Sequence, residues 1–337
     1  MKMYEKSIAP LLFNIEAETA HNLFLKSLSI SGKSEIALGL LKGLSYENSP
    51  VAKRVGGLRF RHPIGLAAGF DKDGIAISAL EALGFAFITI GTVTPVSQPG
   101  KPRPRIFRDS RNQALWNRLG FPNKGADAMV ERLKKQPCMP IPLGISIGKG
   151  VETHLEDAAD DYLYCLKKLS PYASFIEVCI SSPNTFRLRS LQGGKHLDDL
   201  LNRLVDNSYK PLWIKLAPDM KPEALKRAVE ICEKYLNPER DAIIMGNSTV
   251  DRSVNSDIMK GGYSGRPLFP KALAEVKSIE TKLPLVGCGG VFNGWDTFRM
   301  LNEGGCELVQ IHSAIPYRGP FVAKKILNEL IVVMKDK

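Results

Sequence analysis

The sequence predicts an α/β protein, a (β/α)₈ TIM barrel with a small N-terminal helical extension. Short apolar runs recur eight times after residue 63, and stretches with helical periodicity separate most of them. The repeated units cover roughly 250 residues, the usual length of such a barrel. A doubly wound open sheet fits less well, because no G-x-G-x-x-G motif follows the first run.

Residues 1–45 form the expected extension, in which apolar residues cluster at helical spacing. The clusters at 11–13, 23–28 and 36–41 predict short helices, and Ser31-Gly32 interrupts them. The next segment, 52–63, predicts a small hairpin that turns at Gly56-Gly57. We therefore divide the chain into an N-terminal helical segment, 1–45, and a barrel domain, 46–337.

The barrel strands are expected where the apolar runs lie. These are residues 64–69, 85–94, 141–148, 175–182, 211–218, 242–249, 284–291 and 308–314. Intervening segments such as 73–84 and 222–236 have the periodicity of amphipathic helices.

The composition narrows the class of protein. The net charge of +11 indicates an anionic partner, but the basic residues are spread along the chain, so nucleic acid is not expected. Six scattered cysteines without a C-x-x-C pair indicate reduced thiols in a cytosolic protein, and no metal site is predicted. No apolar run approaches the ~20 residues of a membrane span, and the N-terminus does not resemble a secretory signal.

Active sites of (β/α)₈ barrels form at the carboxyl ends of the strands, and here these ends are rich in lysine, hydroxyl, amide and glycine residues. Gly289-Gly290 and Ser313 follow strands seven and eight, where barrels commonly bind phosphate; the alternative is a simple tight turn. Lys72 and Lys215 could stabilise an anion formed in a reaction, or could be solvated surface lysines.

The fourth run ends in an unusual cluster, I-E-V-C-I-S-S-P-N-T at 176–185. No histidine lies near Ser182 in the sequence, so an acyl-enzyme triad is weakly supported. Ser182 could act as a base in a desolvated pocket, or the Ser-Ser-Pro-Asn segment could be only a capped turn.

With these strand ends identified, the sequence resembles the quinone-dependent, membrane-associated class of dihydroorotate dehydrogenases over nearly the whole chain. The motifs that carry the resemblance are AETAH, PIGLAAGFDKDG, IGTVTPVSQPGKPRPRIFR, NRLGFPNKG, SSPNT-x-x-LR, IKLAPD, GGYSGRPL and GCGG. The resemblance implies a barrel that holds FMN. It also implies a catalytic serine, here Ser182, where the soluble class uses cysteine.

The resemblance carries a set of site residues over to this chain. Those implied to hold FMN are Ala68, Gly69, Lys72, Thr92, Ser146, Cys179, Lys215, Gly246, Gly265, Gly290, His312 and Ser313. Those implied to bind substrate are Lys72, Asn117, Arg118, Leu119, Gly120, Phe121, Cys179, Asn184, Asn247 and Ser248. Ser182 and Lys215 are the implied catalytic residues, and His21, Arg108 and His312 the implied quinone contacts.

The implied activity is FMN-dependent oxidation of (S)-dihydroorotate to orotate in pyrimidine (UMP) biosynthesis, with a quinone as electron acceptor. The extension would form the quinone tunnel and attach the protein peripherally to the cytoplasmic side of the cell membrane. The segment 186–199 is expected to be a lid, since Gly193-Gly194 could act as a hinge.

Four positions depart from the family pattern. The family usually has asparagine where this chain has Ser146 and Cys179, threonine where it has Gly246, and tyrosine where it has His312. A thiol at 179 replaces an amide that would both donate and accept hydrogen bonds. Two alternatives therefore stay open: an FMN oxidoreductase with a shifted substrate, and a divergent flavin- or orotate-binding protein with little turnover.

Overall fold

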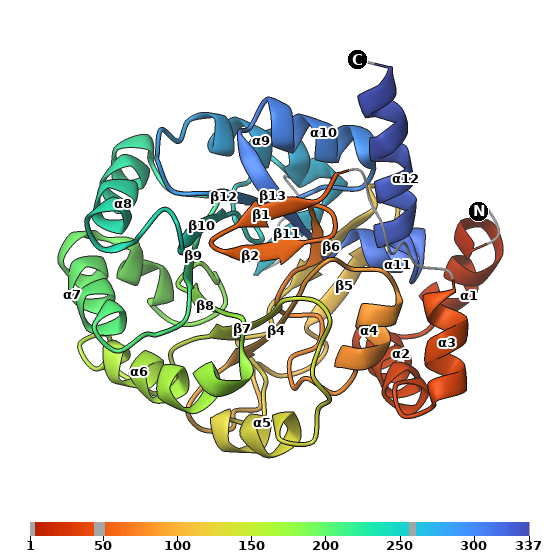
Figure 1. Cartoon of the computed structure of the whole chain (residues 1–337), viewed down its shortest axis with the longest axis horizontal. Coiled ribbons are helices and arrows are strands. Elements are labelled where there is room, and N and C mark those ends of the chain that lie inside the picture. Colours follow the sequence, from red (N-terminus) through yellow and green to blue (C-terminus); the bar gives the residue numbers. More distant parts are fainter. Residues whose placement is uncertain (1–3, 44–50, 256–260, 337) are drawn as a thin grey trace.

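The computed structural model describes residues 4–43, 51–255 and 261–336. Its centre is a closed barrel of eight parallel strands that follow one another around the ring in chain order (Figure 1). The strands are β3 (Ile64–Leu66), β4 (Ile88–Val93), β7 (Leu143–Ile147), β8 (Phe175–Cys179), β9 (Leu212–Leu216), β10 (Ala242–Met245), β12 (Leu285–Cys288) and β13 (Cys306–Ile311). Seven lie within the apolar runs and β13 begins two residues before the run 308–314, so the barrel prediction is confirmed.

Helices surround the barrel (Figure 1), and each contains buried apolar residues. They are α4 (Ile77–Ala82), α5 (Ala126–Leu133), α6 (Ala158–Leu169), α7 (Gly194–Val205), α8 (Pro222–Tyr235), α9 (Phe269–Lys277), α10 (Gly294–Asn302), α11 (Ala314–Arg318) and α12 (Val322–Lys335). In α7 these residues are Leu197, Leu200, Leu201 and Leu204, which share one face at i, i+3, i+4 and i+7.

The amino end of the barrel is closed by packing of aromatic rings. Glycines make room for two of them: a Cβ built on Gly65 or Gly144 would lie 2.2 Å from the ring of Phe87 or Phe175. The Phe175 ring stacks on Trp213 with centroids 3.8 Å apart. The hairpin of β1 (Lys53–Val55) and β2 (Leu58–Phe60), predicted from the sequence, covers this end, so a ligand site is left to the opposite end.

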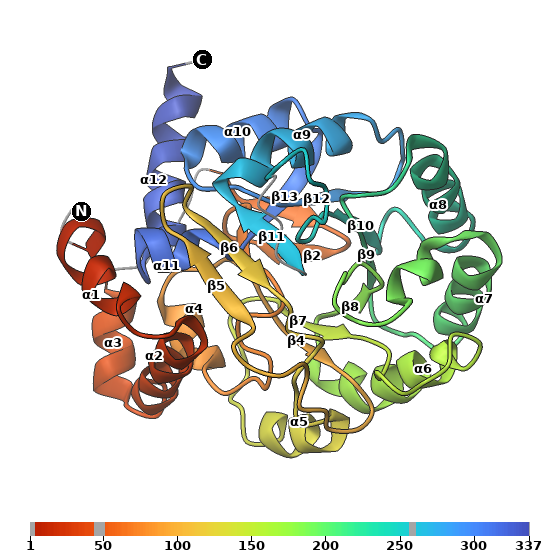
Figure 2. The same cartoon turned by 180° about the vertical axis from the view of Figure 1, so that it is seen from behind.

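A three-stranded antiparallel sheet lies over the carboxyl end of the barrel (Figure 2). It consists of β5 (Ile106–Asp109), β6 (Ala114–Asn117) and β11 (Gly262–Gly265), with β6 in the middle. The sequence analysis did not predict this sheet. Each strand has only four residues, and β11 comes from a part of the chain far from β6, so no local pattern marks the pairing.

The N-terminal extension is helical, as predicted. It contains a short π-helix (Tyr4–Ile8), α1 (Ala9–Phe13), α2 (Ala17–Ser31) and α3 (Glu35–Lys42), and Gly32 caps the end of α2. These helices pack beside α4, β5 and α11 on one side of the barrel. The expected boundary between residues 45 and 46 lies outside the described residues.

Candidate active site

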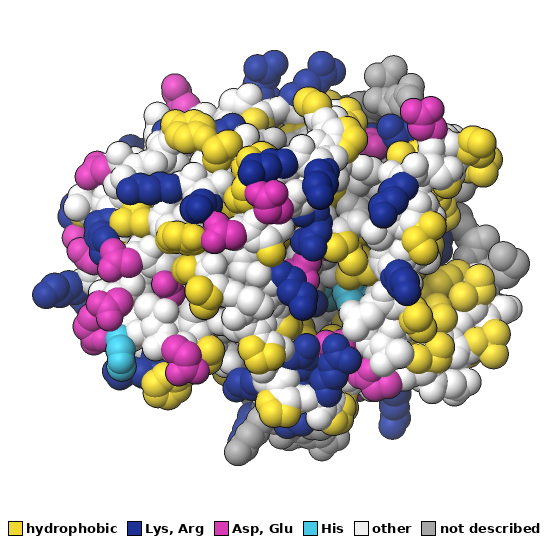
Figure 3. Space-filling view, turned by 90° about the horizontal axis from the view of Figure 1, so that it is seen from below, with side chains coloured by type: hydrophobic (Ala, Val, Ile, Leu, Met, Phe, Trp, Pro, Cys, Tyr) yellow, Lys and Arg dark blue, Asp and Glu magenta, His cyan; other side chains and the backbone are white. Residues whose placement is uncertain are grey.

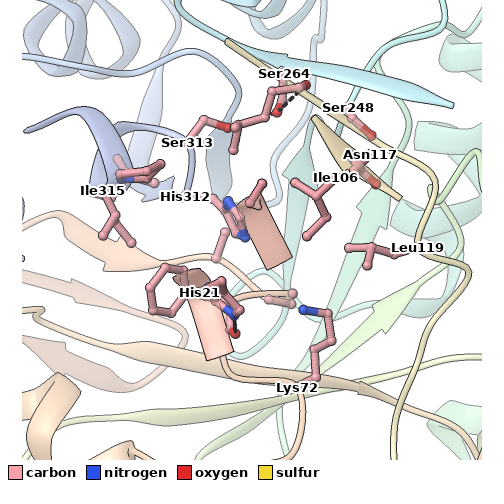
Figure 4. A pocket seen from close by; sticks show the side chains of 18 of the residues that line it. His21, Lys72, Ile106, Asn117, Leu119, Ser248, Ser264, His312, Ser313 and Ile315 are labelled. Carbon is pink, nitrogen blue, oxygen red and sulfur yellow. Dashed lines mark hydrogen bonds between the residues drawn. The ribbon is translucent and has the colours of Figure 1, made fainter. Parts of the chain in front are cut away.

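One continuous cavity of about 620 Å³ opens at the carboxyl end of the barrel. Strand ends of the barrel form its floor, β5, β6 and β11 cover it, and α1 and α2 line its outer part (Figure 4). Its volume lies within the range of ~300–1,000 Å³ that is typical of small-molecule and cofactor sites.

The catalytic serine candidate lies on the loop after β8. Ser182 lines the cavity and is 7% exposed, and its Oγ accepts a hydrogen bond from the backbone N–H of Asn184. No hydrogen bond joins Ser182 to a histidine or carboxylate among the residues that the structure describes. This arrangement offers no acyl-enzyme triad, and leaves the hydroxyl directed to a ligand or a water.

Amide side chains surround this serine. Asn184 Nδ2 donates to Asn117 Oδ1 at 2.8 Å, which ties the β8 loop to β6. Asn247, after β10, donates from Nδ2 to Ser181 Oγ at 2.9 Å. Three segments distant in the sequence are thereby held together, and their remaining amide groups can recognise a planar polar ligand.

The segment predicted as a lid, 186–199, contains two helical elements in this structure. Its first part contains a 3₁₀ helix (Leu188–Gln192), and residues from Gly194 onward belong to α7. Arg189 donates to the carbonyls of Ser181 and Ser248 and pairs with Asp219. The second half of the predicted lid, from Gly194 onward, is thus part of a barrel helix, and closure of the segment 186–199 stays a prediction.

The floor of the cavity contains a buried polar cluster. Lys215, on β9, donates to Gln310 Oε1 at 3.1 Å and lies 3.5 Å from the Glu177 carboxylate. Gln310 Nε2 in turn donates to Glu177 Oε2 and to Thr89 Oγ1. Although burial alone would lower the pKa of Lys215, the neighbouring Glu177 carboxylate raises that pKa, so the amine stays charged.

A second cation, Lys72, points into the middle of the cavity near His21 and His312 (Figure 4). Burial lowers the pKa of Lys72 to about 8, while the Glu18 carboxylate opposes this shift. Burial, together with Lys72, lowers the pKa of His312 to about 4 and that of His21 to about 3. Both imidazoles are therefore neutral at physiological pH.

These two histidines mark the passage from the barrel to the extension. His21 Nε2 lies 2.9 Å from the carbonyl oxygen of Phe70, and the Phe70 ring contacts both imidazoles edge to face. Farther out, Arg108 Nη1 donates to the carbonyl of Ile15 at 2.6 Å, and its guanidinium lies over the Phe13 ring. Arg108 thus holds the connection between α1 and α2 against β5.

The opposite side of the cavity presents hydroxyl and glycine residues. Ser264 Oγ and Ser313 Oγ lie 2.9 Å apart, beside Gly289 and Gly290. Gly290 has a φ of +68°, and a Cβ there would lie 2.3 Å from the backbone nitrogen of Phe269, so only glycine fits this turn. The cavity-lining residues described here include no carboxylate on this side, which suits an anion.

Most of the residues predicted from the sequence line the cavity, and four do not. Ser146 is buried behind Thr92, with the two hydroxyls 2.9 Å apart. Gly246 lies against the chain, since a Cβ there would be 1.7 Å from the Cys288 carbonyl oxygen. Gly265 packs on Ala114, and the Arg118 guanidinium turns away to the Pro104 carbonyl. These four residues therefore lie outside the cavity wall, and their contact with a ligand stays a prediction.

The sequence analysis missed several cavity residues, of which Glu177 and Gln310 are the most prominent. Glu177 precedes Cys179 by two residues on β8, so both face the same side of the strand. A carboxylate within an otherwise apolar strand was the feature of the sequence that could have indicated Glu177 as a site residue. Cys288 and Ser264 carried no comparable mark in the sequence.

Comparison with known proteins identifies the family. The family model described as dihydroorotate dehydrogenase matches residues 51–334, which is most of the chain. The chain belongs to the dihydroorotate dehydrogenase family. The family and the oxidoreductase class predicted from the sequence are therefore confirmed.

Curated relatives share about two fifths of this sequence. The dihydroorotate dehydrogenase (quinone) of Burkholderia multivorans is 42% identical over 95% of this chain and 95% of its own length. That of Burkholderia pseudomallei is also 42% identical, over 95% of this chain and 96% of its own. The solved structure of the Eimeria tenella enzyme with ferulenol superposes with a TM-score of 0.86 at 26% identity, covering 97% of this chain and 95% of that one.

The residues present fit a flavin mononucleotide. The glycine and hydroxyl side of the cavity could hold a phosphate through Gly290 and Ser313, and Lys215 on the floor would supply a cation to the flavin. The cavity extends from there to the serine and amide cluster around Ser182. It therefore has room and suitable groups for both a cofactor and a small polar substrate.

Proposed function

We propose that this protein oxidises (S)-dihydroorotate to orotate in pyrimidine biosynthesis, holds FMN as its cofactor and passes the electrons to a quinone. The observation that carries this proposal is the continuity of the cavity. It joins the polar cluster around Ser182 and Asn184 to an apolar passage between α1 and α2. One enclosed space thus has a polar end for an acidic substrate and an apolar end for a quinone.

At the polar end, different residues remove the proton and bind the substrate. Bound FMN supplies the two-electron acceptor. Ser182 removes the proton at C5 of dihydroorotate, in a pocket that is nearly closed to solvent. Lys72 pairs with the substrate carboxylate, and Asn117, Asn184 and Asn247 hold its amide edges.

The apolar end supports a peripheral attachment to the cytoplasmic side of the cell membrane. Ile8, Leu12 and Leu23 both line the cavity and are 40%, 38% and 56% exposed, so the passage opens among them. Leu11, Ile36 and Leu40 of the extension are 70–80% exposed, and apolar side chains gather on the right of Figure 3, where the extension lies.

Exposed lysines accompany these apolar residues, namely Lys6, Lys26, Lys33 and Lys42. Apolar insertion combined with attraction of lysines to anionic lipid is the usual basis of interfacial binding. No helix among the described residues is long and apolar enough to cross a membrane.

Anaerobic mixing of the flavin-loaded protein with dihydroorotate tests the proposal. We expect the flavin absorbance to bleach, and to return when a quinone is added. Mass measurement of the ligand released by heat should give FMN and not FAD. A protein that takes up no FMN, or a flavin that dihydroorotate does not bleach, would refute the assignment.

A second candidate is an FMN oxidoreductase that acts on a related but different substrate. Cys179 favours it, because its thiol lies in the cavity wall with its Sγ 3.7 Å from Ser181 Oγ, and a thiol is a weak hydrogen-bonding group. Failure of dihydroorotate to reduce a firmly bound FMN, with reduction by another cyclic amide or acid, would support this candidate.

A further inference from the structure

The floor of the cavity contains an acidic group that no step proposed above uses. Glu177 is the only carboxylate among the described residues that line the cavity, and its side chain is 0% exposed. It faces Lys215, whose side chain is 4% exposed, at 3.5 Å. The two charges are thus held together in a part of the protein from which water is excluded.

The hydrogen bonds around this pair fix its orientation. An ammonium group can only donate, so the Gln310 oxygen faces Lys215, at 3.1 Å. The Gln310 amide nitrogen then faces Glu177 Oε2, at 3.3 Å, and Thr89 Oγ1, at 3.1 Å. Gln310 therefore bridges the cation and the anion, while Glu177 Oε1 has no hydrogen-bond donor and faces only the charge of Lys215.

The neighbouring thiols do not supply the compensating charge. Burial raises the pKa of both Cys179 and Cys288, so these groups are neutral at physiological pH. Glu177 is the carboxylate that contacts Lys215, at 3.5 Å, so the positive charge of Lys215 is balanced by this side chain.

We propose that Glu177 acts through Lys215 to set the reduction potential of the flavin, by offsetting the positive charge that would otherwise favour the reduced, anionic form. The inference rests on the proposed function only in requiring a flavin in this cavity. A cation next to a flavin stabilises added negative charge, and a carboxylate 3.5 Å from that cation weakens the effect. The balance keeps electrons available for transfer to the quinone instead of trapping them on the cofactor.

The test is the midpoint potential of the bound flavin, measured with a reference dye and a chemical reductant in the absence of dihydroorotate. The variant E177Q keeps the shape of the side chain and removes its charge. We expect it to shift the equilibrium toward reduced flavin about tenfold, which is about 30 mV for a two-electron couple. K215M should shift it in the opposite direction, and E177Q/K215M should return within about threefold of the wild type.

Glu81 provides a matched control, since it is also a buried carboxylate and lies 3.5 Å from the guanidinium of Arg61, away from the cavity lining. E81Q should leave the potential unchanged. If E177Q does not retain flavin, K215M is compared with E177Q/K215M. Adding E177Q to K215M should then raise the midpoint potential of the flavin.

The outcomes separate this inference from the proposed function. A wild-type potential in E177Q, or a potential of E177Q/K215M that does not return toward the wild-type value, would overturn the inference and leave the proposed function intact. A wild-type protein that binds no flavin would overturn both.

Discussion

The two ends of the cavity differ in polarity and in exposure to solvent. The inner end holds Lys215, Glu177 and Gln310, all nearly closed to solvent and joined by hydrogen bonds and charge. The outer end is bordered by Leu12 and Leu23, which are apolar and open to solvent. A proton-transfer reaction needs fixed polar groups, whereas a lipid-soluble acceptor needs an apolar entrance.

The comparison indicates that the two half-reactions, reduction of the flavin by dihydroorotate and its reoxidation by a quinone, depend on separate residues. The serine and amide cluster is built on the segments that follow β8 and β10 and on β6, while the entrance is built on helices that pack beside the barrel. His21, Phe70 and His312 lie between these regions and are shared by both. Substitutions at one end should therefore leave the other half-reaction largely unchanged.

The largest expected effect is at the polar end. Ser182→Ala should slow reduction of the flavin by dihydroorotate by about 10²–10⁴-fold, the usual contribution of a general base. Rapid-mixing kinetics measure this step, and reoxidation of chemically reduced protein by quinone should keep its normal rate. A loss below tenfold would mean that another group is the base.

A substitution set at the apolar end should show the reverse pattern. L11E/I36E/L40E replaces exposed residues outside the cavity lining, so the folded barrel is left intact. Loss of three apolar contacts should weaken binding to anionic vesicles at least about a hundredfold in a flotation assay, since each such side chain contributes about 1.5–3 kcal/mol when buried. Turnover with a short, soluble quinone should not change.

Val332→Glu is the control for this set, because Val332 is 58% exposed on α12, outside the extension. It should bind vesicles like the wild type. Equal loss of binding in the control would indicate a general charge effect and would remove the special role of the extension.

Cys179→Asn tests whether residue 179, at the polar end, contacts the substrate. If dihydroorotate is the substrate, an added amide should tighten orotate binding about tenfold, since an unpaired polar edge costs roughly 1–3 kcal/mol. Orotate titration followed by flavin absorbance gives the dissociation constant. An unchanged constant would show that residue 179 does not contact the ligand, and weaker binding would favour the shifted-substrate candidate.

The smallest expected effect is a pH dependence that arises from Lys72. Its folded-state pKa is lowered to about 8, so the positive charge is present below pH 8 and is lost as the pH rises above it. kcat/KM for the anionic dihydroorotate should fall several-fold between pH 8 and 9.5. Lys72→Arg should remove this decline, because a guanidinium stays protonated there; a decline that persists in this variant would exclude Lys72 as its cause.

Much of this structure could be predicted from the sequence because it depends on local patterns. Each barrel strand is a short apolar run between turns, and the hairpin at 52–63 and the break at Gly32 are marked by glycines. The carboxyl ends of parallel strands must meet at one end of a barrel, so Lys72, Ser182 and Lys215 could be assigned to one site.

Only the tertiary structure revealed the groupings that depend on distant contacts. The β5–β6–β11 sheet, the Glu177–Lys215 pair and the displacement of Ser146 and Gly246 from the cavity wall all arise from neighbours on other strands. The sequence by itself determined the barrel, the family and the order of polar strand ends, because periodicity and motifs are properties of contiguous residues. Which side chains touch the cavity, and which charges cancel, was decided by packing between segments that only the fold brings together.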